Sequence, residues 1–188
     1  MKNNLGKVFE QNLQSYAKKD GIFCMRIQDS DLSFAGGNSK FTNPSLCDFI
    51  MFYKNHLFAV ECKSTKYKSF SIDLGQDAKG AKMIKAHQIH NLINCNTYDN
   101  IEGVFIFNFR IEDNDAIIDE HTYILNIENF SKFISVTGKL SINEQDIIDF
   151  GGIQCNQEKK RKYFTYDIKT LFDDYLEEVN NNVSYDIE

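Results

Sequence analysis

Two carboxylates and a lysine, Asp48, Glu61 and Lys63, stand on two adjacent apolar segments of the chain. The segments, residues 46–53 and 56–63, have the length of strands and are rich in aromatic and β-branched residues. Two residues separate them, which favours a β-hairpin. In a hairpin with a two-residue turn, Asp48 lies directly across from Glu61, and Lys63 points to the same face.

This arrangement predicts a divalent-metal centre. Directly opposed side chains have Cβ atoms about 4.5 to 5.5 Å apart, and two carboxylates at that distance repel unless a cation lies between them. Carboxylate oxygens suit Mg²⁺ or Mn²⁺. A lysine two residues after Glu61 could hold an attacking water or balance the charge of a phosphate.

The alternative is a surface ion-pair cluster, because Glu-x-Lys also occurs by chance. Both faces of the hairpin are apolar, however, which predicts a central pair of strands that is buried on both sides. Charged groups in such strands are rarely left without a partner or a metal. The residues of the two faces are Ile50, Phe52, Leu57 and Ala59 on one side and Cys47, Phe49, Met51, Tyr53, Phe58, Val60 and Cys62 on the other.

Composition favours one α/β domain, since 188 residues with 42% hydrophobic content can fill a single core. The five cysteines show no Cys-x-x-Cys spacing, so we expect reduced thiols and neither a zinc site nor a disulfide framework. No segment approaches the length of a membrane span, and the start lacks the apolar region of a leader peptide. We therefore expect a cytoplasmic protein with no membrane partner.

The net charge of −6 argues against a nucleic-acid partner, but the charges are unevenly distributed. Six lysines stand between residues 63 and 85, and no Lys or Arg follows Asp173. A basic segment that begins at the predicted metal centre is suited to a phosphate backbone; the alternative is a solvated, lysine-rich helix face. The lysines are Lys63, Lys66, Lys68, Lys79, Lys82 and Lys85.

The remaining elements follow from periodicity and turn signals, and they predict a mixed central sheet flanked by helices. Gln88 stands in an otherwise apolar helical row, either to reach a metal-bound water or a phosphate or as a core glutamine bonded to backbone. We expect helices at 4–19, 76–95, 127–134, 143–150 and 167–179, strands at 22–27, 69–74, 103–109, 121–127 and 162–167, a polar loop at 28–45 and a frayed end at about 180–188.

Asp48 and Glu61-x-Lys63, behind a helix that contains Gly6-x-x-Phe9-Glu10, resemble the PD-(D/E)XK nuclease superfamily. Within it the chain is similar to the RecU-type Holliday junction resolvases of Gram-positive bacteria and their phages. Three segments carry that similarity: 44–49 resembles Pro-Ser-x-x-Asp-Tyr, 60–66 resembles Glu-x-Lys-x-Thr-Lys, and 86–89 contains His-Gln-Ile.

The resemblance implies a restriction-endonuclease-like core over about residues 4–110, within a single nuclease domain spanning 1–188. It also implies a homodimer, dependence on Mg²⁺ or Mn²⁺, and paired cuts in four-way DNA junctions during recombination and repair. Asp48 and Glu61 would be metal ligands, Lys63 would position the water, and Gln88 and Glu10 would support the site. Lys66, Lys68, Lys79, Lys82 and Lys85 are the expected phosphate contacts.

Departures from the pattern leave alternatives open. Cys47 replaces the proline that precedes the aspartate in the broad superfamily, a common variation that leaves the expected chemistry unchanged. The segment 28–45 is shorter than the resolvases' projecting stalk and holds only Lys40 as a basic residue, so linear or other branched DNA is an alternative substrate. A non-catalytic DNA-binding module is a third reading, against which the intact carboxylates and Lys63 argue. Glu10 could instead be an exposed helix residue.

Overall fold

The computed structural model describes residues 5–27, 45–75, 81–114, 116–161 and 163–183. The predicted loop at 28–45 therefore lies almost entirely outside the described residues, and so does Lys79.

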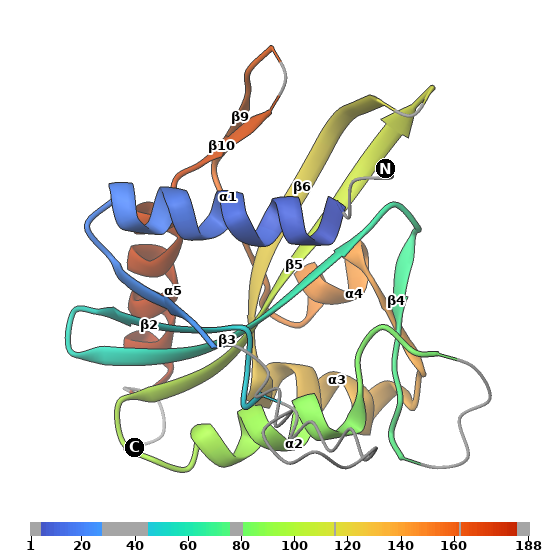
Figure 1. Ribbon diagram of the computed structural model, residues 1–188. Helices are drawn as coiled ribbons and strands as arrows, with labels where there is room; N and C mark the ends of the chain where they lie inside the picture. Colours follow the sequence, from blue (N-terminus) through green and yellow to red (C-terminus); the bar gives the residue numbers. More distant parts are fainter. Residues whose placement is uncertain (1–4, 28–44, 76–80, 115, 162, 184–188) are drawn as a thin grey trace, which may run out of the picture.

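A six-stranded sheet forms the centre of the molecule, with helices on both faces (Figure 1). Strands β3 and β5 run parallel, and the other neighbours are antiparallel. The predicted fold class, a mixed sheet flanked by helices, is confirmed. In spatial order the strands are β1 (Phe23–Arg26), β2 (Phe49–Tyr53), β3 (His56–Thr65), β5 (Ile101–Asp113), β6 (Ala116–Asn126) and β8 (Ile153–Gln154).

The sheet separates two hydrophobic cores. Helices α1 (Leu5–Lys19) and α5 (Ile168–Val183) cover one face, where Phe9, Leu13 and Phe172 are buried. Helices α2 (Ala86–Cys95), α3 (Ile127–Thr137) and α4 (Glu144–Asp149) cover the other. None of the described helices combines the length and apolarity needed to cross a membrane.

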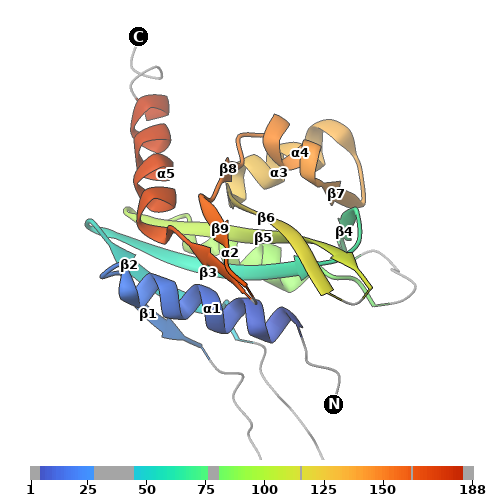
Figure 2. The same cartoon turned by 90° about the horizontal axis from the view of Figure 1, so that it is seen from above.

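Two short strand pairs lie outside the central sheet. One joins β4 (Ser69–Ser71) to β7 (Ser141–Asn143). The other is a hairpin of β9 (Gln157–Lys159) and β10 (Phe164–Tyr166), which lies beside α1 and the β5–β6 pair (Figure 2). This hairpin closes one end of the space between α1 and the sheet.

The register predicted for the β2–β3 hairpin is confirmed from Phe49↔Val60 to Tyr53↔His56. Lys54 and Asn55 form the two-residue turn with φ of 43° and 59°, as a type I′ turn requires. Near this turn Phe52 is exposed, so the hairpin is not buried on both faces along its whole length.

The predicted strand start at Leu46 is wrong, because the ladder ends at Phe49. Asp48 lies just outside β2, and its backbone N–H donates to Val60 O over 3.0 Å. Its carboxylate, rather than its backbone, binds the N–H of Cys62. Asp48 is therefore beside the Glu61 segment without being its ladder partner, and Leu46 is an exposed residue that does not pair with Lys63.

Three helix boundaries also differ from the prediction, one of them the end of α3, which lies at Thr137 and not at residue 134. The helix expected from residue 76 begins at Ala86, since Ile84 forms a bridge with Ile72 and Lys85 has an extended backbone. The last helix continues to Val183, beyond the fraying expected from residue 180. The Ile72–Ile84 bridge joins two separate segments, so local periodicity could not predict where α2 begins.

Helix α2 packs closely on β5 because Gly103 has no side chain. A Cβ at Gly103 would lie 2.3 Å from the carbonyl oxygen of Leu92, a separation that real structures do not tolerate. The glycine thus sets the height of α2 over the sheet, and with it the position of Gln88 relative to β3.

Candidate functional site

Glu61 is a buried carboxylate on β3, with 4% of its surface exposed. Its Oε1 accepts a hydrogen bond from Lys63 Nζ over 2.8 Å and another from Gln88 Nε2. Because Glu61 and Lys63 are two residues apart on one strand, both point to the face that α2 covers. We call Glu10, Asp48, Glu61, Lys63 and Gln88 the Glu61 cluster.

Gln88 joins Lys63 and Glu61 from the first turn of α2. Its Oε1 accepts from Lys63 Nζ over 2.9 Å and from the backbone N–H of Lys85 over 3.0 Å, while its Nε2 donates to Glu61. An ammonium and an N–H only donate and a carboxylate accepts, so this amide orientation satisfies every partner. Gln88 thus bonds backbone and also contacts Lys63 and Glu61. Its expected contact with a metal-bound water or a phosphate stays a prediction.

Asp48 approaches the cluster from the segment before β2. Its Oδ2 accepts the N–H of Cys62 over 2.8 Å, next to Glu61 along β3. Asn91 of α2 holds the preceding segment by donating from Nδ2 to the carbonyl oxygen of Leu46 over 3.2 Å. Helix α2 thus positions both Gln88 and the approach to Asp48, a role of Asn91 that the sequence analysis missed.

Glu10 lies on α1, and its carboxylate interacts electrostatically with Asp48 and Lys63 of the cluster. It forms a 2.5 Å ion pair with Arg26, the last residue of β1. Burial raises the pKa of Glu10, and the nearby negative charge of Asp48 raises it further. Glu10 is therefore not a free surface residue. Arg26 was also missed, although it is the one charged residue in the segment predicted as the first strand.

Burial raises the pKa of Glu61 to about 7. Lys63 opposes this effect, while the negative charge of Asp48 adds to it. Burial thus makes the charged form of Glu61 costly, and the positive charge of Lys63 offsets only part of that cost.

The described residues contain no group of three His, Cys, Asp or Glu side chains arranged to hold a metal by themselves. Asp48 and Glu61 nevertheless fit Mg²⁺ or Mn²⁺, because such ions often bind one or two carboxylates and complete their shell with water and substrate phosphate.

Four of the five expected phosphate contacts are among the described residues, and they lie in two segments, one after β3 and one before α2. Lys66 and Lys68 follow β3, and Lys66 Nζ lies 3.5 Å from Glu112. Lys82 and Lys85 precede α2, at the end that carries Gln88. Lys68 and Lys85 are exposed, which leaves their ammonium groups accessible to a ligand.

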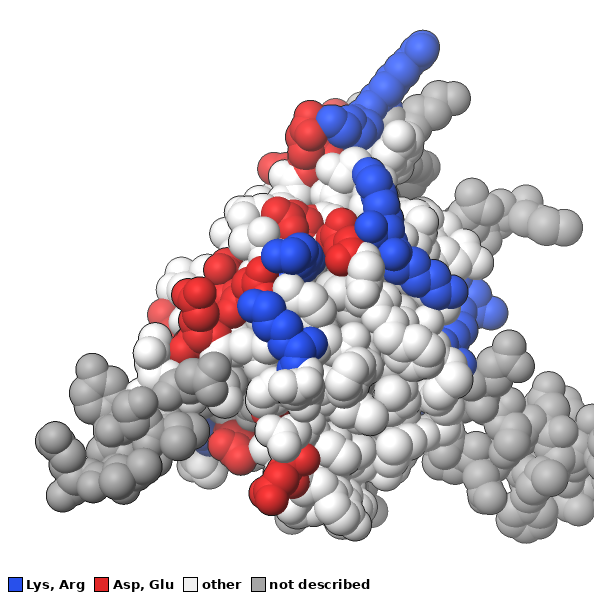
Figure 3. Space-filling view, turned by 90° about the vertical axis from the view of Figure 1, so that its left-hand side faces the viewer, with Lys and Arg blue, Asp and Glu red and all other residues white. Residues whose placement is uncertain are grey.

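The acidic C-terminal segment is partly neutralised in the folded chain. Asp173 pairs with Lys54 over 2.5 Å and with Lys169 over 2.8 Å. These partners hold the pKa of Asp173 well below its usual range. Figure 3 shows basic and acidic side chains intermixed on this face. The separation of charge along the sequence is therefore reduced in space.

No protein-family model matches the chain. Its fold is similar to the solved structure of Archaeoglobus fulgidus Hjc, a Holliday junction resolvase from an archaeal hyperthermophile, with a TM-score of 0.47 and 16% identity over 79% of this chain and 95% of Hjc. In sequence it is 31% identical over 174 residues to the SPbeta prophage-derived uncharacterized protein YotM of Bacillus subtilis (strain 168), covering 90% of this chain and 85% of YotM. The chain therefore belongs to the family of the prophage-derived protein YotM.

Proposed function

We propose that this protein is a metal-dependent endodeoxyribonuclease that hydrolyses DNA phosphodiester bonds. The observation that carries the proposal is the environment of Glu61. This carboxylate is buried, is close enough to Asp48 for the two charges to interact, and shares one oxygen between Lys63 and Gln88. An ion pair between Glu61 and Lys63 with a purely structural role does not need a second carboxylate nearby, because the charge of that carboxylate repels Glu61.

Each residue of the cluster has a place in this chemistry. Asp48 and Glu61 would hold Mg²⁺ or Mn²⁺, which when bound supplies Lewis-acid activation of water and phosphate. Lys63 carries three donors on its ammonium group, so it can orient the attacking water while it bonds Glu61 and Gln88. Attack at phosphorus breaks the bond to the 3′ oxygen, and the motif resemblance implies 5′-phosphate and 3′-hydroxyl products.

Glu10 and Gln88 act as positioning residues in this scheme. Gln88 fixes the ammonium group of Lys63 relative to Glu61. Glu10 adds negative charge beside Asp48 and is itself held by Arg26. Residues around metal ligands commonly change metal affinity or activity by 10- to 100-fold, roughly, when they are replaced.

The finer proposal is a crossover-junction nuclease that cuts four-way DNA in recombination and repair. Its support is the similarity of residues 44–49, 60–66 and 86–89 to RecU-type resolvases. The short segment 28–45, with Lys40 alone, favours linear or other branched DNA instead. Incubation with equimolar four-way junction and linear duplex at one Mg²⁺ concentration separates the two: faster cleavage of the junction supports the resolvase, and equal cleavage favours the alternative.

The same resemblance supports a homodimer, whose two sites would cut symmetric branches together. Strand β1 is the edge of the central sheet, and Phe23, Met25 and Phe52 are about half exposed there. Such an apolar edge suits contact with a second copy. Light scattering after size-exclusion chromatography gives the mass directly, and a monomer at micromolar concentration would contradict the dimer.

The decisive experiment replaces Asp48 with Asn and measures both cleavage in Mg²⁺ and DNA binding in Ca²⁺. We expect cleavage to fall by roughly a thousandfold with little change in binding, because the amide has the shape of the carboxylate without its charge. The control is Asp174→Asn, an exposed residue of α5 that removes the same charge.

Cleavage by Asp48→Asn at the native rate would overturn the proposed function. If the native protein cleaves no DNA and titration calorimetry detects no divalent metal binding, the non-catalytic DNA-binding module is the correct reading.

A further inference from the structure

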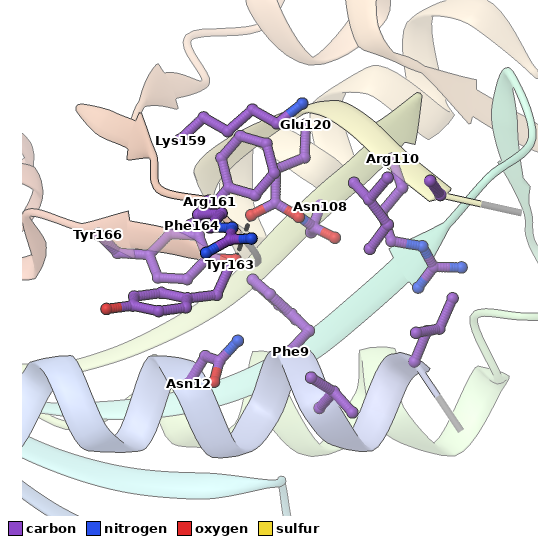
Figure 4. A pocket seen from close by; sticks show the side chains of 14 residues that line it. Phe9, Asn12, Asn108, Arg110, Glu120, Lys159, Arg161, Tyr163, Phe164 and Tyr166 are labelled. Atoms are coloured by element: carbon purple, nitrogen blue, oxygen red, sulfur yellow. Dashed lines mark hydrogen bonds between the residues drawn. The ribbon is translucent and has the colours of Figure 1, made fainter. Parts of the chain in front are cut away.

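A second candidate site lies on the other flank of α1. A cavity of about 410 Å³ opens between α1, the distal part of the β5–β6 pair and the β9–β10 hairpin (Figure 4). We call it the hairpin cavity. Its volume is within the range of small-molecule sites. None of its lining residues belongs to the Glu61 cluster.

The polar wall of the hairpin cavity contains a buried carboxylate. Glu120 of β6 is 4% exposed and accepts a hydrogen bond from the hydroxyl of Tyr166. Within the described part of the chain, no basic group lies within ion-pair distance of Glu120. The side chain of Asn108 and the more distant positive charge of Arg110 also favour the charged form of Glu120. A carboxylate nevertheless has acceptor capacity beyond these contacts. Glu120 is thus suited to accept N–H donors from a ligand.

Asn108 adds a fixed polar group beside Glu120. It is fully buried on β5, donates to Thr122 Oγ1 over 3.1 Å and accepts from Ser64 Oγ over 2.6 Å. Because both ends of the amide are bonded, the Glu120 side of the cavity is rigid.

Aromatic and apolar side chains form the other walls of the cavity. Phe9 of α1 packs edge-on against Tyr166, with ring centroids 5.8 Å apart. Tyr163 lines the cavity and is 55% exposed, so its ring is accessible to a ligand that stacks. This combination suits a flat, partly polar ring.

Three basic residues line the cavity: Arg110, Lys159 and Arg161. Arg161 is exposed and forms no ion pair within the described residues, whereas its neighbour Lys160 pairs with Glu158 over 2.5 Å. Arg110 lies on the opposite side of Glu120 and Asn108 in Figure 4 and donates to Ser64 Oγ over 2.8 Å. Arg161 is therefore the group best placed to bind a phosphate from outside.

We propose that the hairpin cavity binds a single unstacked nucleotide, with its base against Tyr163, an amino group of the base donating to Glu120, and its phosphate on Arg161. Each part of the ligand corresponds to one observed feature: a π surface, a buried acceptor and an unpaired cation. Proteins that bind unstacked bases use the same combination of stacking and hydrogen bonds to base edges.

The position of the cavity connects it to the Glu61 cluster. Helix α1 presents Glu10 toward Arg26 and the cluster, and Leu5, Val8 and Asn12 toward the cavity. On β3, Ser64 contacts the cavity residue Arg110, while the preceding Lys63 belongs to the cluster. If the protein is a DNA nuclease, as proposed above, the bound nucleotide is an unpaired nucleotide of its DNA substrate. A free nucleotide has the same chemical groups and is the other possible ligand.

Titration calorimetry with dCMP and dTMP in EDTA tests the pocket without any cleavage. We expect dCMP to bind more tightly by about tenfold, because cytosine presents an amino group where thymine presents a carbonyl oxygen. Glu120→Gln should abolish this preference, since an amide can donate as well as accept. Arg161→Ala should weaken both nucleotides about tenfold, and the control Lys160→Ala, which removes the same charge, should change them less than twofold.

The second arm identifies the source of the nucleotide. Duplexes with and without one unpaired cytosine are bound to Glu61→Gln protein in EDTA. We expect a preference of about tenfold for the duplex with the unpaired cytosine, which Arg161→Ala should remove and Lys160→Ala should retain. This result supports an unpaired nucleotide of DNA as the ligand. Binding of dCMP without this preference would instead assign the cavity to a free nucleotide. Absence of dCMP binding together with equal affinity for both duplexes would overturn the proposal. Since neither arm measures cleavage, failure of the nuclease proposal would not be confused with failure of this one.

Discussion

Glu61 and Glu120 are equally buried carboxylates on strands of the same sheet, yet their surroundings differ. Each is 4% exposed, and burial raises the pKa of both. Glu61 bonds the ammonium group of Lys63 and interacts with the charge of Asp48. Glu120 bonds the neutral hydroxyl of Tyr166, and the positive charge of Arg110 acts on it only from beyond ion-pair distance.

The difference shows that burial alone does not define the chemistry of a carboxylate. A second carboxylate and a fixed lysine make Glu61 suitable for a cation and a phosphate. Neutral donors and aromatic walls make Glu120 suitable for the N–H groups of an uncharged ring. The four predictions below test this division between the two sites.

The largest effect is expected when each glutamate is replaced with glutamine. Glu61→Gln should lower single-turnover cleavage of a fully paired DNA by roughly a thousandfold, because it removes the charge of a proposed metal ligand. Glu120→Gln should lower it less than about threefold, since that cavity binds no group of a paired strand. Similar losses in both variants would show that the two carboxylates do not have separate roles.

The second prediction concerns stability against pH in metal-free buffer. The pKa of Glu61 is about 7 in the folded chain and has an ordinary value of 4.5. Between these values the folded state binds more protons than the unfolded state, so this group loses its stabilising contribution as pH rises. From pH 5 to pH 8 the free energy of unfolding of the native protein should fall by about 2 kcal/mol more than that of Glu61→Gln.

Urea unfolding of both proteins at the two pH values in EDTA measures this difference. A constant free-energy difference between the native protein and Glu61→Gln would contradict the raised pKa. The Asp174→Asn variant is the control. Because Asp174 is exposed, the free energy of unfolding of this variant should change between the two pH values as it does in the native protein.

The third prediction tests the link between α2 and β3. Gln88→Leu keeps the approximate size of the side chain but removes its hydrogen bonds to Lys63 and Glu61. The cleavage rate should fall by about 10- to 100-fold, and the rate should respond less to added Mg²⁺. The control is His90→Ala, an exposed residue of the same helix. An equal loss in both variants would indicate damage to α2 rather than to the site.

The smallest effects are expected at the lysines. Lys68→Ala and Lys85→Ala should each weaken binding of paired DNA about two- to threefold and reduce the salt dependence by about one counterion. Lys160→Ala, beside the hairpin cavity, should leave both quantities unchanged because its charge is already paired with Glu158. Fluorescence anisotropy at several salt concentrations gives both measures, and an unchanged salt slope at Lys68 and Lys85 would exclude them as phosphate contacts.

Much of the β2–β3 hairpin was predictable because its signals are local. The two-residue turn and the apolar runs fixed which residues pair, and the pairing is confirmed from Phe49 to Tyr53. The start of α2 was not predictable, since residues 81–85 have helical periodicity but Ile84 instead bridges to Ile72. That contact joins two segments twelve residues apart, and the residues around either segment do not predict it.

The sequence by itself determined the mixed sheet between helices, and it identified Asp48, Glu61, Lys63 and Gln88 as one candidate centre. These follow from side-chain periodicity and from residue types whose chemistry is restricted. Only the tertiary structure decided that Asp48 binds the N–H of Cys62 from outside the strand, and that Glu120 meets the β9–β10 hairpin in a cavity. The reason is physical: both arrangements depend on contacts between chain segments that meet only when the two cores pack against the sheet.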